Sequence, residues 1–346
     1  MAQRKQYALI DLLKLLSAVM IIAIHTQPFF GHESSVLYYP YAYLKCFAIP
    51  LFFVSSSYLF FSKYFNRTKQ EKRAYLFKWL KRIGSLYGIY SLINLLFAIV
   101  TKSADQIFSL SGALRFIFLG EGNGYLWFVV ALILAVVVQC LIYAISNKTI
   151  RMFLLNALFF GSLGLMIILQ FYYHYFENWK IVSIYYSVFK DVRNVLSACF
   201  YVNLGVLCVL LDRLEPAKKR ILLLLTPVIF VLSAAEYLFV VKLNLYKEEY
   251  STLLIAVFIV FLMMVAVNVD IHIKDTLFIR KISSVMYFWQ RYVIMAFLML
   301  AQLTGNAVLN NHVVQFFAVL LICVGLTFFF EALKKTKLKK VISYLY

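Results

Sequence analysis

Three ionisable residues interrupt the first long apolar run of the chain, which covers residues 7–28. They are Asp11, Lys14 and His25. The step from Lys14 to His25 corresponds to about 1100° of helical rotation, so both side chains lie within about 20° of one helix face, about 16 Å apart along the axis. Asp11 lies one turn before Lys14 and can pair with it. Because a charge in a bilayer costs roughly 2.5 kcal/mol or more, these residues are candidate functional groups.

Each of these residues has two interpretations. An imidazole is the side chain whose ordinary pKa suits proton transfer near neutral pH, so His25 is a candidate catalytic base. A histidine near a helix end is also common at a membrane interface. Lys14 can bind an anionic substrate, or it can extend to the lipid headgroups with Asp11 as its counter-ion. The residues alone leave both alternatives open.

Two further cations fall inside apolar runs, Lys45 in the second and Arg291 in the ninth. Lys45 is close to the outer end of its run and can extend to the interface. Arg291 is deeper and follows Gln290, which favours a polar cavity between helices. Glu236 is a candidate partner of Arg291. Three loop residues are expected to lie in solvated turns: His32, Glu33 and Glu121.

The sequence contains no GxGxxG, P-loop, HExxH or GxSxG pattern, so a bound phosphate must be held by side chains. A basic run is suited to this, because clustered cations attract phosphate and arginine adds bidentate geometry. The same run is also typical of a cytoplasmic membrane anchor. Its members are Lys72, Arg73, Lys78, Lys81 and Arg82.

Composition predicts the elements that must position these residues. The 346 residues are 64% hydrophobic, whereas soluble domains are roughly 45–50% apolar, so lipid is the expected solvent. The net charge of +19 does not indicate nucleic acid, because the 34 Lys and Arg residues form short clusters between apolar runs and suit an anionic leaflet. The first run is longer than a signal-peptide core and is predicted to be retained. The five cysteines lie in apolar runs without metal-ligand spacing, which predicts core residues and neither a disulfide framework nor a metal site.

The predicted fold is all-α, a polytopic integral membrane protein of about ten transmembrane helices. Residues 1–346 are predicted to form one domain with a core at about 7–333, because no linker-like or low-complexity stretch interrupts the apolar runs. The predicted spans are 7–28, 40–62, 83–101, 125–146, 152–172, 192–211, 221–241, 251–270, 282–304 and 312–333.

The positions of the cations predict the orientation, because Lys and Arg resist translocation. The N-terminus and every second connection, starting with 63–82, carry 24 of them, and the opposite set carries 7. With an even number of spans, both termini are predicted to be cytoplasmic. Lys72 and Lys335 are then inside, and Glu33 and Asn310 are outside.

Five segments resemble the membrane-bound acyltransferase-3 family. "IDLLKLLSAVMIIAIH" is similar to its first helix, with Asp11 and His25 matching and Lys14 where the family has arginine. "IPLFFVSSSYLFF" is similar to its second helix, with Ser56 matching and Ser57 in place of glycine. The remaining three are "FKWLKRI" from Phe77, "YLWFVVAL" from Tyr125, and "SSVMYFWQRYVIM" from Ser283, in which Gln290 occupies or adjoins an expected histidine.

The resemblance implies an enzyme of the plasma membrane that transfers an acyl group, usually acetyl from cytoplasmic acetyl-CoA, to a hydroxyl of a cell-envelope glycan or related acceptor. Acyl-CoA is then a substrate, and no bound cofactor is expected. His25 would be the base or acyl-relay residue, and Asp11 is the second expected catalytic residue. The expected substrate-binding residues are Lys14, Lys78, Lys81, Arg82, Ser56, Trp127, Gln290 and Arg291.

Two other functions fit the same sequence. Some relatives in this family are associated with amino-acid uptake, so a transporter of a small solute such as serine is the first alternative, followed by a polysaccharide polymerase or flippase. Lys14 bears on this choice, since lysine keeps the charge of arginine and loses its planar fork. The residues do not indicate an oligomeric state.

Overall fold

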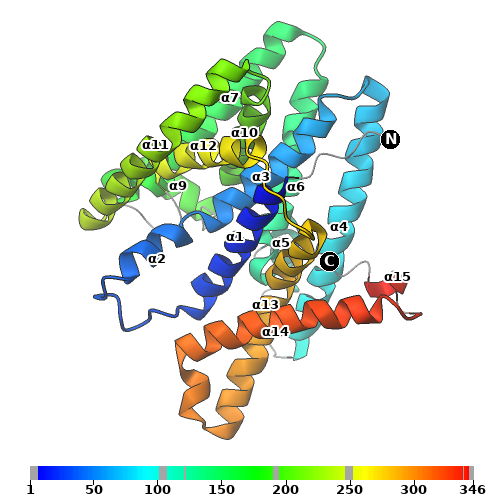
Figure 1. Ribbon diagram of the computed structural model, residues 1–346, viewed down its shortest axis with the longest axis vertical. Helices are drawn as coiled ribbons and strands as arrows, with labels where there is room; N and C mark the ends of the chain where they lie inside the picture. The colour runs from blue at the N-terminus through cyan, green and yellow to red at the C-terminus, as the bar shows by residue number, and fades with distance from the viewer. Residues whose placement is uncertain are drawn as a thin grey trace. The chain divides into compact units, whose positions relative to one another are not determined.

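The computed structural model describes residues 7–100, 107–120, 122–189, 195–245, 252–337 and 339–342. The structure is 83% helical, and the described residues contain no strand. The prediction of an all-α fold is therefore confirmed (Figure 1).

Eight helical segments are long and apolar enough to cross a membrane, by length and composition. Two shorter apolar helices, α10 (Val195–Leu211) and α12 (Leu253–Asn268), coincide with the other two predicted spans. A polytopic membrane protein is thus confirmed, whereas the count of ten and the orientation of the termini stay predictions. The eight segments are α1 (Ala8–Thr26), α2 with α3 (Tyr38–Lys45, Ala48–Tyr64), α4 (Lys69–Val100), α6 (Trp127–Ala144), α7 with the π-helical turn η2 (Lys148–Met166, Ile167–Phe171), α11 (Pro216–Lys242), α13 (Thr276–Thr304) and α14 (His312–Leu333).

Two of these helices begin well before the predicted spans. Helix α4 starts at Lys69, so the basic run that was predicted to be a connection is helical. Helix α13 starts at Thr276 and includes Arg280 in its first two turns. Hydropathy identifies only the apolar part of a helix, and Lys, Arg and Glu are good helix formers that extend it into the polar region.

The chain divides into two compact units, each described here by itself. Unit 1 comprises Met1–Phe52 and Val265–Tyr346, and unit 2 comprises Phe53–Met264. The prediction of a single domain stays a prediction.

Helices α1, α13 and α14 pack on one another and form the centre of unit 1 (Figure 1). Small and branched side chains line this contact, which lets the helices approach closely. α15 (Lys339–Ile342) adds Ile342 to a second cluster with Val285 and Phe330. The buried residues of the main cluster are Ala18, Ile22, Met286, Val293, Ile294, Val319 and Cys323.

Capping residues determine where α13 begins and ends and where α14 begins. The Asp275 side chain accepts a hydrogen bond from Phe278 N at the start of α13. Gly305, in the left-handed conformation at φ 63°, ends this helix. The short 3-10 turn η3 (Ala307–Asn310) follows, and Asn311 then caps α14 by accepting hydrogen bonds from Val313 N and Val314 N. The chain therefore returns from α13 into α14 through a tight connection.

In unit 2, α10 packs against both α6 and α7. Helices α3 and α10 also approach closely, and the Ser57 hydroxyl donates to the carbonyl of Val202 over 2.7 Å. A Cβ at Gly205 would lie 2.6 Å from the Val54 carbonyl oxygen, so only glycine fits there. The connecting segments contain α5 (Leu110–Phe118), η1 (Gly124–Leu126), α8 (Tyr173–Phe176) and α9 (Lys180–Phe189).

Candidate functional site

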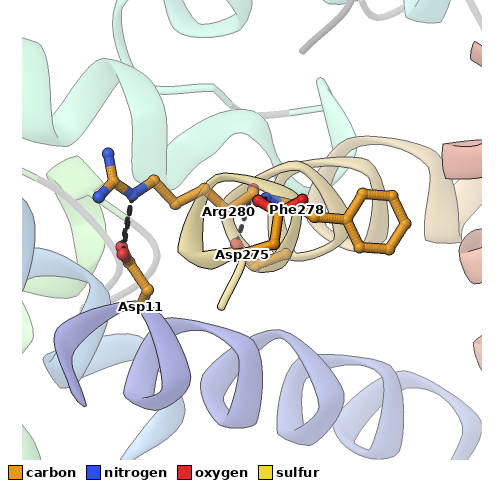
Figure 2. A network of polar contacts seen from close by, with 5 residues as sticks. Asp11, Asp275, Phe278 and Arg280 are labelled. Atoms are coloured by element: carbon orange, nitrogen blue, oxygen red, sulfur yellow. Dashed lines mark hydrogen bonds and ion pairs between the residues drawn. The ribbon is translucent and has the colours of Figure 1, made fainter. Parts of the chain in front are cut away.

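Asp11 forms an ion pair with Arg280 of α13, a residue 269 positions away in the chain (Figure 2). The Nε–H group of Arg280 donates to both carboxylate oxygens of Asp11, at 2.8 Å each. The Asp11 side chain is only 4% exposed, whereas that of Arg280 is 47% exposed. The buried Asp11 carboxylate is therefore paired with a cation that is itself still partly exposed. A charge within a membrane is expected to have such a partner.

Lys14 follows Asp11 by one turn of α1, is partly buried, and attracts the Asp11 carboxylate electrostatically. The pairing of Asp11 with Lys14 stays a prediction, and the structure adds an ion pair between Asp11 and Arg280. Sequence reasoning missed Arg280, because the predicted span began at residue 282 and left it in a connection. A buried carboxylate in the first helix was the one signal that a cation from another helix was required.

A second ion network lies beside this pair in unit 1. Lys281, the residue after Arg280, pairs with Glu331 of α14, and Lys334 is 3.2 Å from the other oxygen of Glu331. Consecutive helical residues point about 100° apart, so Arg280 and Lys281 reach two different neighbouring helices. Charged contacts thereby connect α1, α13 and α14 at one end of the three helices.

His25 lies in the last turn of α1 and is partly buried. Two carbonyl groups near it, at the end of the helix, accept hydrogen bonds from side chains of other elements. Tyr41 of α2 donates its hydroxyl to Ala23 O at 3.0 Å, and His312 of α14 donates Nδ1–H to Thr26 O at 2.8 Å. His312 also packs against Phe30, with ring centroids 4.8 Å apart. The backbone that carries His25 is thus held in place on two sides.

His312 is the second residue of the site that sequence reasoning missed. Donation through Nδ1 leaves Nε2 as the acceptor in the neutral ring. The signal was available, since a histidine directly after Asn311 at the start of the last apolar run is at the predicted outer side, as is His25.

Gln290 and Arg291 lie in the interior of α13, as predicted. Gln290 is fully buried, and its Nε2 donates a long hydrogen bond of 3.4 Å to the Tyr287 carbonyl. Among the described residues, Gln290 Oε1 and the Arg291 Nη1 atom have no hydrogen-bond partner, although both atoms are buried. Buried polar groups without partners are costly, and such atoms are suited to binding a polar ligand.

The remaining predicted site residues belong to unit 2. Lys78, Lys81 and Arg82 lie on α4 and are exposed. Ser56 is partly buried on α3 beside Ser57. Trp127 is the first residue of α6, and its ring lies 6.2 Å from that of Phe53.

The structure explains two glycine-related features near these residues. Ser57, which stands where the resembling family has glycine, fits because the facing residue on α10 is Gly205. Gly120 has φ +70°, and a Cβ there would lie 2.9 Å from the backbone nitrogen of Trp127. Each of these two close approaches depends on a glycine, Gly205 in one and Gly120 in the other, because any side chain would collide with the facing residue.

The other polar residues identified in the sequence have structural roles. Lys45 Nζ lies 5.5 Å from the ring centre of Tyr41. Both carboxylate oxygens of Glu236 accept hydrogen bonds, from Tyr172 on one side and from Thr252 and Leu254 N on the other. The loop residues His32 and Glu33 are exposed, as expected for a solvated turn, and Glu121 lies outside the described residues.

The Glu33 carboxylate stabilises its own turn. Hydrogen bonds from the backbone N–H groups of Glu33 and Gly31 hold the pKa of Glu33 below its ordinary value. Within the described ranges, no group of three or more His, Cys, Asp or Glu side chains is arranged to hold a metal ion.

Many apolar helices, with ionisable residues paired between α1, α13 and α14, define a multi-pass membrane protein. Comparison with protein families gives the finer class, because residues 7–332 match the acyltransferase-3 family, described as an acyltransferase domain. The match covers nearly the whole chain, and the protein belongs to this family. No curated protein and no solved structure matches the chain significantly.

Proposed function

We propose that the protein is an O-acyltransferase of the plasma membrane that transfers an acyl group, normally acetyl, from acyl-CoA to a hydroxyl of a cell-envelope glycan or related acceptor. The family match over residues 7–332 is the observation that carries this proposal. The continuous helix α1 supports it, because Asp11, Lys14 and His25 lie on one helix whose ends are each tied to other parts of unit 1.

In the proposed reaction, His25 acts as a general base in a site with little water. The imidazole takes the proton of the acceptor hydroxyl while the hydroxyl oxygen attacks the thioester carbonyl. The carbon–sulfur bond then breaks, and the imidazolium returns the proton to the CoA thiolate. In the alternative route the acyl group transfers first to the imidazole, with release of the CoA thiolate, and then to the acceptor oxygen. The proton of the acceptor hydroxyl again ends on the CoA thiol.

Cations hold the donor in this proposal. Lys14 and the exposed cations Lys78, Lys81 and Arg82 would bind CoA phosphates, and the orientation predicted from the cation count puts them on the cytoplasmic side. Lys14 and His25 are about 16 Å apart along α1, so phosphates near Lys14 require the pantetheine arm to extend along the helix toward His25.

The buried polar atoms of α13 suit the acceptor. Gln290 Oε1 can accept a hydrogen bond from a glycan hydroxyl, and the Arg291 guanidinium can donate one. Ser56 and Trp127 in unit 2 stay predicted substrate-binding residues.

Release of free CoA thiol from acetyl-CoA tests the proposal against the transporter alternative. Purified protein in nanodiscs, given acetyl-CoA and cell-envelope glycan, should release thiol, and His25→Ala should not. Accumulation of serine or another solute by proteoliposomes that neither bind nor consume acetyl-CoA would contradict the proposal and favour a transporter.

A further inference from the structure

The ion pair between Asp11 and Arg280 involves only one of the three guanidinium nitrogens, Nε. Only Nε–H donates to Asp11, and the described residues offer no partner to the two terminal nitrogens of the guanidinium. Figure 2 shows one of these nitrogens pointing away from Asp11 and the other lying beside Nε. The Arg280 side chain is 47% exposed, so a ligand can reach them.

Asp11 keeps the guanidinium plane in place by holding its Nε. An arginine that is fixed at Nε presents its two terminal N–H groups as a fork, the geometry that matches two oxygens of a phosphate. Fixing the fork beforehand also reduces the conformational entropy that binding costs. The Asp11 carboxylate would therefore act as a positioning group for an anion site.

We propose that the terminal guanidinium nitrogens of Arg280, together with Lys14, form a phosphate-binding site for the acyl-CoA donor. Lys14 supplies a point charge without a fork, and Arg280, from a distant part of the chain, supplies the planar fork. The inference rests on the proposed function, since it assigns the donor phosphate of that same site to particular residues.

The charges around Arg280 favour an anion. The Asp11–Arg280 pair with Lys14 and the neighbouring Glu331 cluster together contain four cations, Lys14, Arg280, Lys281 and Lys334, and two carboxylates, Asp11 and Glu331. Cations outnumber carboxylates among these residues, and an excess of positive charge attracts phosphate over roughly the Debye length of 8–10 Å. The nearest other acid at the start of α13, Asp275, is bound to the backbone N–H of Phe278.

A phosphate group can come from CoA or from the headgroup of an anionic phospholipid. The proposal commits to CoA, because Arg280 is tied to the helix that carries His25. Lipid is the alternative that the experiment must separate.

CoA affinity of variants, measured by calorimetry in phosphatidylcholine nanodiscs, tests the inference. Arg280→Lys keeps the cation that Asp11 needs and removes the fork, so it should weaken CoA binding about tenfold, the value of one charge-assisted hydrogen bond. Arg280→Gln should weaken binding further. Lys335→Gln is the matched control, because it removes one exposed cation that makes none of the ion pairs of this network, and its affinity should be unchanged. Thermal unfolding of each variant identifies any loss that is due to misfolding.

The outcomes separate this inference from the proposed function. If wild type binds CoA and Arg280→Lys, folded, binds it equally well, the inference is wrong and the proposed function stands. If wild type does not bind CoA, the proposed function fails, and inorganic pyrophosphate then tests the anion site alone: binding that Arg280→Gln abolishes supports an anion site, and absence of binding overturns it. If an Arg280-dependent effect occurs only with phosphatidylglycerol and not with CoA or pyrophosphate, the ligand is a headgroup and the donor assignment is wrong.

Discussion

Replacement of Arg280 should destabilise the protein more than replacement of Asp11, although the two residues form one ion pair. The reason is the difference in exposure between the two side chains, 4% for Asp11 and 47% for Arg280. After Arg280→Gln, a carboxylate that water cannot reach loses its direct counter-ion. After Asp11→Asn, the guanidinium can still be solvated.

The magnitudes follow from these surroundings. Breaking a buried pair by removing one partner typically costs about 3–5 kcal/mol. Lys14 also attracts Asp11, so we expect Arg280→Gln to lower the free energy of unfolding by about 2–3 kcal/mol. Asp11→Asn loses a hydrogen bond and leaves no buried charge, so about 1 kcal/mol is expected. The double variant removes both charges and should be about 1 kcal/mol more stable than Arg280→Gln alone.

Equilibrium unfolding in SDS micelles, followed by the fluorescence of the four tryptophans, measures these free energies. Lys335→Gln serves as the control and should change stability by no more than about 0.5 kcal/mol. If Asp11→Asn destabilises the protein as much as Arg280→Gln, or if the double variant is the least stable of the three, the burial argument is refuted.

Three further predictions test other parts of the structure. Gly205→Ala should cost about 1–3 kcal/mol or abolish expression, because its Cβ would meet the Val54 carbonyl; normal thermal stability would contradict the α3–α10 contact. His312→Ala should lower the free energy of unfolding by about 1 kcal/mol through loss of its hydrogen bond to Thr26 O, and an unchanged stability in SDS unfolding would argue against that contact. Single cysteines at positions 33 and 335, in a cysteine-free background, should react with a membrane-impermeant maleimide on intact cells only at position 33, and labelling at 335 would reverse the predicted orientation.

The helices could be predicted from the sequence because apolar runs of about 20 residues have few alternatives in lipid. The first run, 7–28, became α1 almost residue for residue, and 312–333 became α14. Helices α4 and α13 begin before the predicted spans at 83 and 282, since hydropathy is insensitive to charged turns that extend a helix. The tight connection at Gly305 is consistent with glycine at the end of a helix.

The polar residues of α1 could be found from composition, but their partners could not. Asp11, Lys14 and His25 are conspicuous because each is costly in a bilayer. In the sequence, Arg280 resembles any other cation of a predicted cytoplasmic connection, and no local pattern indicates that folding brings α13 against α1. His312 is similar, since its hydrogen bond to Thr26 O joins residues 286 positions apart.

Turnover of acetyl-CoA by wild type and by His25→Ala tests the central claim most directly. The assay follows free CoA thiol and transfer of labelled acetyl to cell-envelope glycan, with CoA affinity and thermal unfolding measured on the same samples. We predict that wild type turns over acetyl-CoA, while His25→Ala binds CoA with little change, unfolds at the same temperature and shows no turnover. Normal turnover by a folded His25→Ala protein would contradict the assignment of His25 as the catalytic base.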